Sequence, residues 1–329
     1  MKKIGVLGAG SWGTALAVLL QENGNQVDIW SIDEKEVEML SENREHQTKL
    51  PGVVLVEEIM VSTDIEAVIK EKDILVMAVP SPFTRATAKK MAEYVTKEQI
   101  IVNVAKGIED DTLMTLTEQI EDEIKGATVA VLSGPSHAEE VGRKLPTTCV
   151  AGAEEIAVAK IIQDTFMSEV FRVYTSTDVL GIELGGSLKN VIALAAGIAD
   201  GMGYGDNTKA ALITRGIAEI ARLGVKMGGK IETFSGLTGI GDLIVTCASQ
   251  HSRNRKAGYL IGQGRTMQEA MDEVKMVVEG VYSVKAAVKL AEKYEVSLPI
   301  IEKINEVLFK GKDPKEAVKE LMVRDGKSE

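Results

Sequence analysis

The chain has 329 residues, of which 45% are hydrophobic and 26% are charged, and its formal net charge is −11. This composition is typical of a globular protein, and it excludes a disordered chain, a collagen and a disulfide scaffold. The acidity also argues against general nucleic-acid binding, because phosphate binding needs a basic surface.

The first half of the chain alternates short β-branched segments with helical ones. Strands are predicted at Lys3–Leu7, Val27–Trp30, Ile74–Val79, Ile100–Val104, Thr128–Leu132 and Phe171–Tyr174. Helices are predicted between them at Ser11–Glu22, Glu34–Ser41, Thr63–Lys70, Thr84–Tyr94 and Thr112–Glu123. Apolar strands separated by helices indicate a parallel sheet covered on both faces. We therefore predict a doubly wound α/β domain over residues 1–176.

The strand pattern ends near residue 177, and helical periodicity replaces it. Apolar residues from Leu184 to Ala199 recur at the i, i+4, i+7, i+8 spacing of a long packed helix. Further helices are predicted at Ala210–Leu223, Met267–Glu273, Ser283–Tyr294 and Pro299–Leu308. We predict an all-α second domain over residues 177–329.

The charge is distributed unevenly between these two domains. Residues 1–176 carry 17 basic and 29 acidic side chains, whereas residues 177–329 carry 21 and 20. An anionic ligand that is held by side-chain charge is therefore expected in the second half.

Cysteine, histidine and hydropathy patterns favour a cytoplasmic protein without metal or membrane span. Cys149 and Cys247 lie 98 positions apart and form no C-x-x-C pair. The three histidines are far apart, so a zinc site is not expected. The apolar run at the N-terminus is too short for a signal peptide, and the run Val191–Ala199 is shorter than the about 20 residues that span a membrane.

A dinucleotide fingerprint, G-x-G-x-x-G, follows the first predicted strand as Gly8-Ala9-Gly10-Ser11-Trp12-Gly13. Gly8 permits the tight turn, Gly10 lets the backbone approach a pyrophosphate, and Gly13 lets the next helix sit close to the strand. The anion then meets free N–H groups and the positive end of the helix dipole. The alternative is a glycine-rich turn with only a packing role.

The acidic partner of such a fingerprint, which binds the ribose 2′-hydroxyl, usually lies about 20 positions on. Asp33 lies 20 residues after Gly13, with Glu34 beside it. Acidic residues are equally favoured at the start of a helix. The choice between NAD and NADP therefore stays open.

Two segments place polar groups at the ends of predicted strands. Lys106-Gly107 follows the strand Ile100–Val104, and Ser133-Gly134-Pro135-Ser136 follows the next strand. Ligands bind beyond the carboxyl ends of strands in open α/β sheets, so Lys106 is placed to meet one. A surface lysine before a turn is the alternative, and Ser136 is predicted to cap a helix.

Two further segments in the second half combine glycine with functional groups. In Glu183–Asn190, Gly185-Gly186 weakens a predicted helix, which suggests that something approaches its backbone closely. Lys189 lies at the edge of the apolar stripe and is expected to point into a cleft, unless it is a snorkelling lysine. Gly236–Asn254 combines three glycines, Asp242 and Ser252-Arg253-Asn254, which is typical of an anion pocket or of an exposed charged turn.

Taken together, these motifs resemble the NAD(P)-dependent glycerol-3-phosphate dehydrogenases of bacteria, in order and over nearly the whole chain. The resemblance implies a Rossmann-type domain, a helical substrate domain and a homodimer. It also implies interconversion of sn-glycerol 3-phosphate and dihydroxyacetone phosphate, supplying phospholipid synthesis. The resemblance also implies which residues form the site, because they occupy the positions of the family's functional residues. The catalytic set is Lys189, Lys106, Asn190, Asp242 and Thr246. The substrate contacts add Gly134, Ser136, Ser252, Arg253 and Asn254. The cofactor contacts are Gly8, Gly10, Ser11, Trp12, Gly13, Lys106, Ala138, Arg253, Val277 and Glu279.

One position departs from the family pattern. Many members carry Arg or His where this chain has Ile32, and a basic group there suits the 2′-phosphate of NADP. The apolar side chain weakens the case for NADP preference.

The implied chemistry requires a base for the C2 hydroxyl of the substrate. A free lysine, with a pKa of about 10.4, is a poor base at neutral pH. Burial near other cations is expected to lower the pKa of Lys189, whereas the charge of Asp242 opposes that shift. Two alternatives remain: a lysine-dependent β-hydroxyacid dehydrogenase, and a sensor that binds NAD(H) without turnover. The sensor gives no reason for Lys106, Lys189 and Asp242 to occur together.

Overall fold

A computed structural model describes residues 1–326 of the chain. It divides into two compact units. The first unit comprises Met1–Lys106 and Met114–Glu183, and the second comprises Gly107–Leu113 and the described residues from Leu184 onwards. The short segment Gly107–Leu113 belongs with the helices of the second unit, where Asp110 pairs with Lys289 at 2.7 Å.

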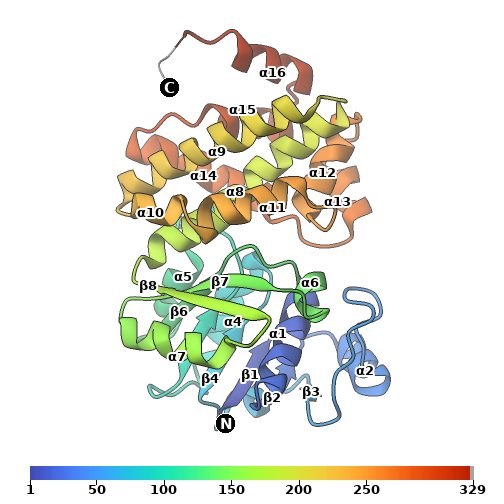
Figure 1. The fold of residues 1–329 in the computed structure, drawn as a ribbon, viewed down its shortest axis with the longest axis vertical. Coiled ribbons are helices and arrows are strands. Elements are labelled where there is room, and N and C mark those ends of the chain that lie inside the picture. Colours follow the sequence, from blue (N-terminus) through green and yellow to red (C-terminus); the bar gives the residue numbers. More distant parts are fainter. Residues whose placement is uncertain (327–329) are drawn as a thin grey trace. The chain divides into compact units, whose positions relative to one another are not determined.

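The first unit is built on one eight-stranded sheet (Figure 1). Its order is β3-β2-β1-β4-β5-β6-β7-β8. The strands are β1 (Lys3–Leu7), β2 (Gln26–Trp30), β3 (Met60–Ser62), β4 (Ile74–Met77), β5 (Ile100–Asn103), β6 (Thr128–Ser133), β7 (Thr147–Ala153) and β8 (Phe171–Ser176). β1 lies between β2 and β4 in parallel register, so the carboxyl ends of these strands share one edge. This order reverses direction at β1, and that reversal is where doubly wound sheets bind ligands.

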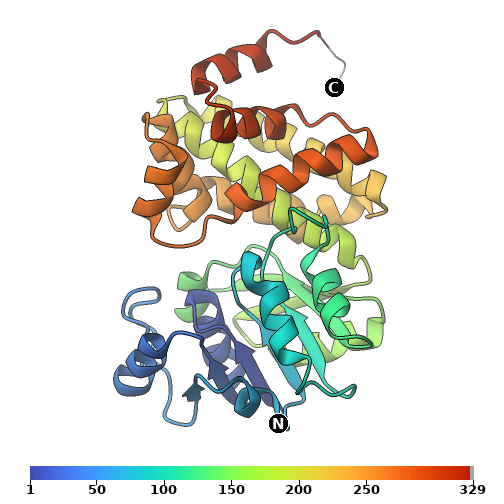
Figure 2. The same cartoon turned by 180° about the vertical axis from the view of Figure 1, so that it is seen from behind.

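Helices cover both faces of the sheet. One face packs on α1 (Ser11–Glu22), α6 (Ala138–Gly142) and α7 (Ile156–Phe166). The other face packs on α3 (Ile65–Ile69), α4 (Thr84–Met91) and α5 (Leu116–Glu123). Figure 2, turned by 180° from Figure 1, shows the molecule from this side. α2 (Glu34–Asn43) follows β2. The predicted doubly wound α/β class is confirmed, because one mostly parallel sheet is covered by helices on both faces.

The sheet differs from the prediction in two strands. β3 was not predicted, because three partly exposed residues give no periodicity. β7 was missed because cysteine, alanine and glycine interrupt the β-branched residues of Thr147–Ala153. β7 pairs antiparallel with β6, so the sheet is mixed rather than wholly parallel.

Two helices begin later than predicted, at positions where a side chain caps the backbone. The predicted helix Thr112–Glu123 begins only at Leu116, because Thr115 and Glu118 form a capping box there. In the same way Asp64 accepts the N–H groups of Glu66 and Ala67, so α3 begins at Ile65.

The second unit contains helices and no strand among residues 184–326. They are α8 (Val179–Gly201, which begins in the first unit), α9 (Asp206–Met227), α10 (Ile231–Phe234), η2 (Leu237–Gly241), α11 (Asp242–Ala248), α12 (Arg253–Gly262), α13 (Met267–Val274), α14 (Glu279–Tyr294), α15 (Pro299–Phe309) and α16 (Pro314–Met322). Sequence periodicity predicted five of these helices, α8, α9, α13, α14 and α15, and missed α10, η2, α11, α12 and α16.

α8 supplies the core of the second unit. Its residues Leu184, Leu188, Val191 and Ile192 are fully buried, as the predicted apolar stripe requires. Within the described residues, α8 is the one helix long and apolar enough to cross a membrane, but 89% of its apolar window is buried inside the protein. It is therefore a core helix.

Candidate functional site

The glycine turn in the first unit has the form that the fingerprint predicts. Gly8 has a φ of 120°, and its N–H donates to the Trp30 carbonyl at 2.8 Å, which joins the turn to β2. A Cβ on Gly13 would lie 1.9 Å from the Gly8 carbonyl oxygen, so only glycine lets α1 approach the turn this closely. Gly8 and Gly13 are thus required by the turn itself.

Gly10 is different, because a Cβ there would meet no protein atom within 4 Å. The residue is the N-cap of α1, and no side chain caps this helix end. Ser11 and Trp12 form the first turn and are half-buried. An open space above uncapped N–H groups at a helix N-terminus fits a pyrophosphate. The residues present therefore suit a dinucleotide.

Predicted ligand residues also gather at the ends of β5 and β6. Lys106 Nζ donates to the Gly134 carbonyl at 3.0 Å, and Ser136 Oγ donates to the same oxygen at 3.0 Å. Ala138, which is 7% exposed, begins α6. The prediction that Ser136 caps this helix was wrong, because the N-cap is His137 and the Ser136 hydroxyl bonds to Gly134 instead.

In the second unit, Lys189 is the centre of a buried cluster. Its Nζ donates to Asp242 Oδ1 at 2.7 Å and to Thr246 Oγ1 at 2.6 Å. The Thr246 hydroxyl donates its own proton to the Asp242 carbonyl oxygen at 2.6 Å, so it accepts from the lysine. Lys189 is 5% exposed and Asp242 is 1% exposed. The lysine is thus an oriented member of an ion pair.

Asn190 and Asn254 form a second buried chain of hydrogen bonds. Asn254 Nδ2 donates to Asn190 Oδ1 at 3.0 Å, and Asn254 Oδ1 accepts the Gly280 N–H at 2.8 Å. These bonds join α8, α12 and the start of α14. Val277 and Glu279 flank that start, just before and at the first residue of α14.

Ser252 and Arg253 form the N-terminus of α12. Ser252 Oγ accepts the Arg255 N–H at 3.1 Å and so caps the helix, while Arg253 is its first residue. Arg255 is bound to Asp200, with Nε 2.8 Å from Oδ2. The Arg253 side chain, by contrast, has no ion pair or hydrogen bond within residues 1–326, and the residue is half-buried. It starts a helix rather than lying in a charged turn.

The structure explains Gly185 of the Gly185-Gly186 pair by packing. A Cβ on Gly185 would lie 2.6 Å from the Thr238 carbonyl oxygen, so the group that approaches this backbone is the chain itself. That approach brings η2 and the start of α11 against α8. It therefore helps to place Asp242 beside Lys189.

Asp33, the acidic partner that the fingerprint predicts, lies at the start of α2. The Asp33 side chain accepts the Lys35 N–H and caps α2. Burial raises the pKa of Cys247 to about 12, against the opposing charge of Lys189, so this thiol stays protonated. Among residues 1–326 no three His, Cys, Asp or Glu side chains group as metal ligands would.

Comparison with known proteins decides the family. The model of the NAD-dependent glycerol-3-phosphate dehydrogenase N-terminus matches residues 3–159, and that of the C-terminus matches residues 178–319. The chain belongs to this family. It is 68% identical to the glycerol-3-phosphate dehydrogenase [NAD(P)+] of Agathobacter rectalis, covering 100% of this chain and 98% of that protein. It is 59% identical to the one of Fusobacterium nucleatum, covering 100% and 99%.

A solved structure agrees with this assignment. The glycerol-3-phosphate dehydrogenase of Coxiella burnetii superposes with a TM-score of 0.95 at 35% identity, covering 98% of this chain and 99% of that one. The family member described here is therefore an oxidoreductase that interconverts sn-glycerol 3-phosphate and dihydroxyacetone phosphate with NAD or NADP, as its sequence predicts.

Glu36, His46 and Lys49 lie near the end of β2 and were not predicted as site residues, although they form a partly buried polar network. Nothing in the sequence indicated them, because the three residues are separated by 10 and 3 positions without a motif.

Proposed function

We propose that Lys189 is the general acid and base of this dehydrogenase, supported by its burial in an ion pair with Asp242. NAD(P)H, when bound, supplies the hydride that adds to C2 of dihydroxyacetone phosphate. The Lys189 ammonium donates the proton that the C2 oxygen takes up. In the reverse direction the lysine amine accepts the proton of the C2 hydroxyl.

Asp242 and Thr246 are proposed as positioning residues for that proton transfer. The carboxylate and the hydroxyl accept from the lysine at 2.7 and 2.6 Å, and they fix the direction of its Nζ. Asn190 is proposed as a further member of the catalytic set and Asn254 as a substrate contact, because they follow Lys189 and Arg253 directly on α8 and α12.

The N-terminus of α12 is the proposed phosphate site. Ser252 caps this ten-residue helix, so backbone N–H groups and the helix dipole favour an anion there. Arg253 adds a planar donor that binds phosphate oxygens in a bidentate manner. Lys106, Gly134 and Ser136, gathered at the ends of β5 and β6, are proposed as further substrate contacts.

The glycine turn of the first unit is the proposed pyrophosphate site. Gly8, Gly10 and Gly13 shape it, and Ser11 and Trp12 provide the first N–H groups of α1. The open space over Gly10 is the observation that supports this placement. Ala138, Val277 and Glu279 are proposed as remaining cofactor contacts on the family resemblance.

Replacement of Lys189 tests the proton-transfer role. Lys189→Ala should leave the affinity for NADH, measured by fluorescence titration, close to wild type. It should lower kcat with dihydroxyacetone phosphate by several orders of magnitude. Lys226→Ala, which removes an exposed lysine of α9, is the matched control. Near-wild-type turnover in Lys189→Ala contradicts the assignment.

Replacement of Arg253 tests the phosphate site. Arg253→Ala should raise KM for dihydroxyacetone phosphate by about tenfold or more, because one charge-assisted contact is lost. Arg265→Ala removes an exposed arginine just beyond α12 and should leave KM unchanged. An unchanged KM in Arg253→Ala removes this residue from the phosphate site.

One assay also separates this activity from its alternatives. NADH and NADPH oxidation is followed with dihydroxyacetone phosphate and then with β-ketoacids. A β-hydroxyacid dehydrogenase would prefer the ketoacids, and a nucleotide sensor would bind NADH without turnover of either substrate.

We further propose that the enzyme is a cytoplasmic homodimer that supplies glycerophospholipid synthesis. Both cysteines are buried and form no disulfide among the described residues, which suits a reducing compartment. An apolar groove of about 660 Å³ opens among α9, α15 and α16 of the second unit, and a second copy would cover it. Light scattering should give 70.8 kDa, twice the 35.4 kDa of one chain. Met322→Arg, at an exposed position of this groove, should shift the mass towards the monomer.

A further inference from the structure

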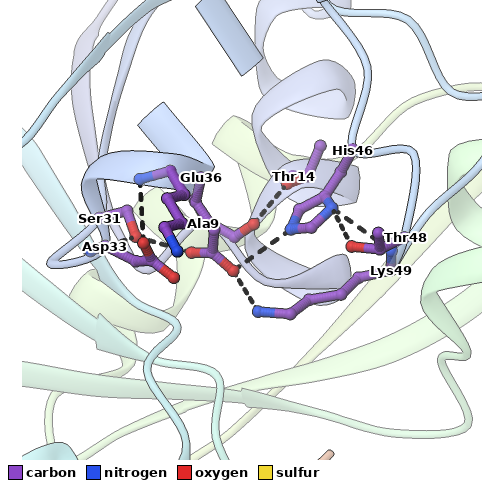
Figure 3. A network of polar contacts seen from close by, with 9 residues as sticks. Ala9, Thr14, Ser31, Asp33, Glu36, His46, Thr48 and Lys49 are labelled. Carbon is purple, nitrogen blue, oxygen red and sulfur yellow. Dashed lines mark hydrogen bonds and ion pairs between the residues drawn. The ribbon is translucent and has the colours of Figure 1, made fainter. Parts of the chain in front are cut away.

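A polar network lies directly beyond β2, beside the glycine turn (Figure 3). Trp30 ends β2 and accepts the N–H of Gly8, so the residue after it lies next to the turn. That residue is Ser31, which is 3% exposed and donates its hydroxyl to Glu36 Oε2 at 2.7 Å. In a dinucleotide-binding sheet this is where the adenosine ribose lies.

Glu36 accepts from three side chains in this network. Besides Ser31, they are His46, whose Nε2 lies 3.3 Å from Glu36 Oε1, and the Lys49 ammonium, which contacts the same oxygen. His46 Nδ1 accepts the Lys49 N–H at 3.3 Å, so a neutral ring carries its proton on Nε2 and donates it to Glu36. Burial raises the pKa of Glu36, but the hydrogen bonds from His46, Lys49 and Ser31 outweigh it and lower the pKa to about 2. Glu36 is therefore an anion at every working pH.

The ion pair between Glu36 and Lys49 determines which charge a substituent on the adenosine ribose would meet. Lys49 is 36% exposed at its side chain and is matched by the carboxylate of Glu36. Ile32, the first exposed residue after β2, is apolar and 69% exposed, and Asp33 next to it is exposed and acidic. A 2′-hydroxyl can donate to an acid in this position, whereas a 2′-phosphate needs a cation.

We propose that Glu36 is a specificity-determining residue that holds Lys49 in an ion pair and so directs the enzyme to NAD(H) rather than NADP(H). A 2′-phosphate approaching this edge meets the negative charge of Asp33 and Glu36. Lys49 can reach the phosphate only by leaving Glu36, which is 13% exposed at its side chain and would lose its counter-charge. The inference rests on the proposed placement of the cofactor at the glycine turn.

The test compares kcat/KM for NADH and for NADPH, with dihydroxyacetone phosphate, in wild type and in Glu36→Gln. We expect wild type to prefer NADH. Glu36→Gln should raise kcat/KM for NADPH by about tenfold, because Lys49 becomes available to the 2′-phosphate. Adding Lys49→Met to Glu36→Gln should abolish that gain. Glu38→Gln, an exposed position on the same helix, makes the same change in net charge and should leave the ratio unchanged.

A measurement on the wild-type enzyme covers the case in which Glu36→Gln does not fold. Adenosine 2′,5′-bisphosphate and adenosine 5′-monophosphate are compared as competitors of NADH, and the 2′-phosphate should give no gain in affinity. A wild-type preference for NADPH, tighter binding of the bisphosphate, or a folded Glu36→Gln with the wild-type ratio each overturns the proposal. Absence of turnover with either cofactor would instead refute the proposed function.

Discussion

The buried pair of Lys189 and Asp242 allows its structural and chemical roles to be measured separately. At 2.7 Å, the ammonium and the carboxylate attract each other by about 6 kcal/mol if the effective dielectric constant is near 20. Desolvation offsets part of this attraction, since Lys189 is 5% and Asp242 is 1% exposed. Removing one partner leaves the other charge buried and uncompensated, which typically costs about 3–5 kcal/mol.

Three variants test this reasoning: Lys189→Met, Asp242→Asn and the double variant. We expect each single variant to lose about 3–5 kcal/mol of unfolding free energy and the double variant to lose much less than their sum. The loss should lower the Tm of a unit of this size by about 10 °C. Turnover should not follow stability, because the double variant still lacks the proton donor.

The assay pairs urea unfolding with initial rates of NADH oxidation. Lys70→Met is the control, since Lys70 pairs with Glu66 on the surface, and it should leave the free energy of unfolding close to wild type. Additive losses in the double variant would refute an interacting buried pair. Recovery of both stability and turnover in the double variant would refute the role of Lys189 in proton transfer.

Two further predictions concern other buried groups. Burial raises the pKa of Glu183 to about 7, against opposing hydrogen bonds from Thr117. Stability contributed by the neutral acid is therefore fully present below about pH 4.5 and is lost as the pH rises towards 7. Wild type should lose about 2–3 kcal/mol more than Glu183→Gln between pH 5 and 8 in urea unfolding, and equal losses would contradict the buried acid. Cys247 should resist iodoacetamide at pH 8 in the native enzyme and react in urea, as peptide mapping by mass spectrometry would show, because its pKa is about 12.

Much of the first unit could be predicted because its signals are local. A buried parallel strand such as Ile74–Met77 must be apolar throughout, and the fingerprint Gly8–Gly13 forms a turn that requires glycine at Gly8 and Gly13. The short strand β3 carried no such pattern. The antiparallel pairing of β7 with β6 could also not be predicted from local sequence patterns, because the direction of a strand depends on how the chain returns to the sheet.

The candidate site likewise combines residues that sequence motifs indicate with contacts that only the folded chain makes. The sequence by itself, read against family motifs, indicated Lys189, Asp242 and Asn254 as functional residues. Only the tertiary structure brought Asp242 to Lys189 across 53 positions and Asn254 to Asn190 across 64. It also revealed Glu36 as the partner of Lys49, which no spacing suggested. The physical reason is that turns and periodicity act between neighbours, whereas ion pairs between distant residues form only when packed helices and loops bring the charges together.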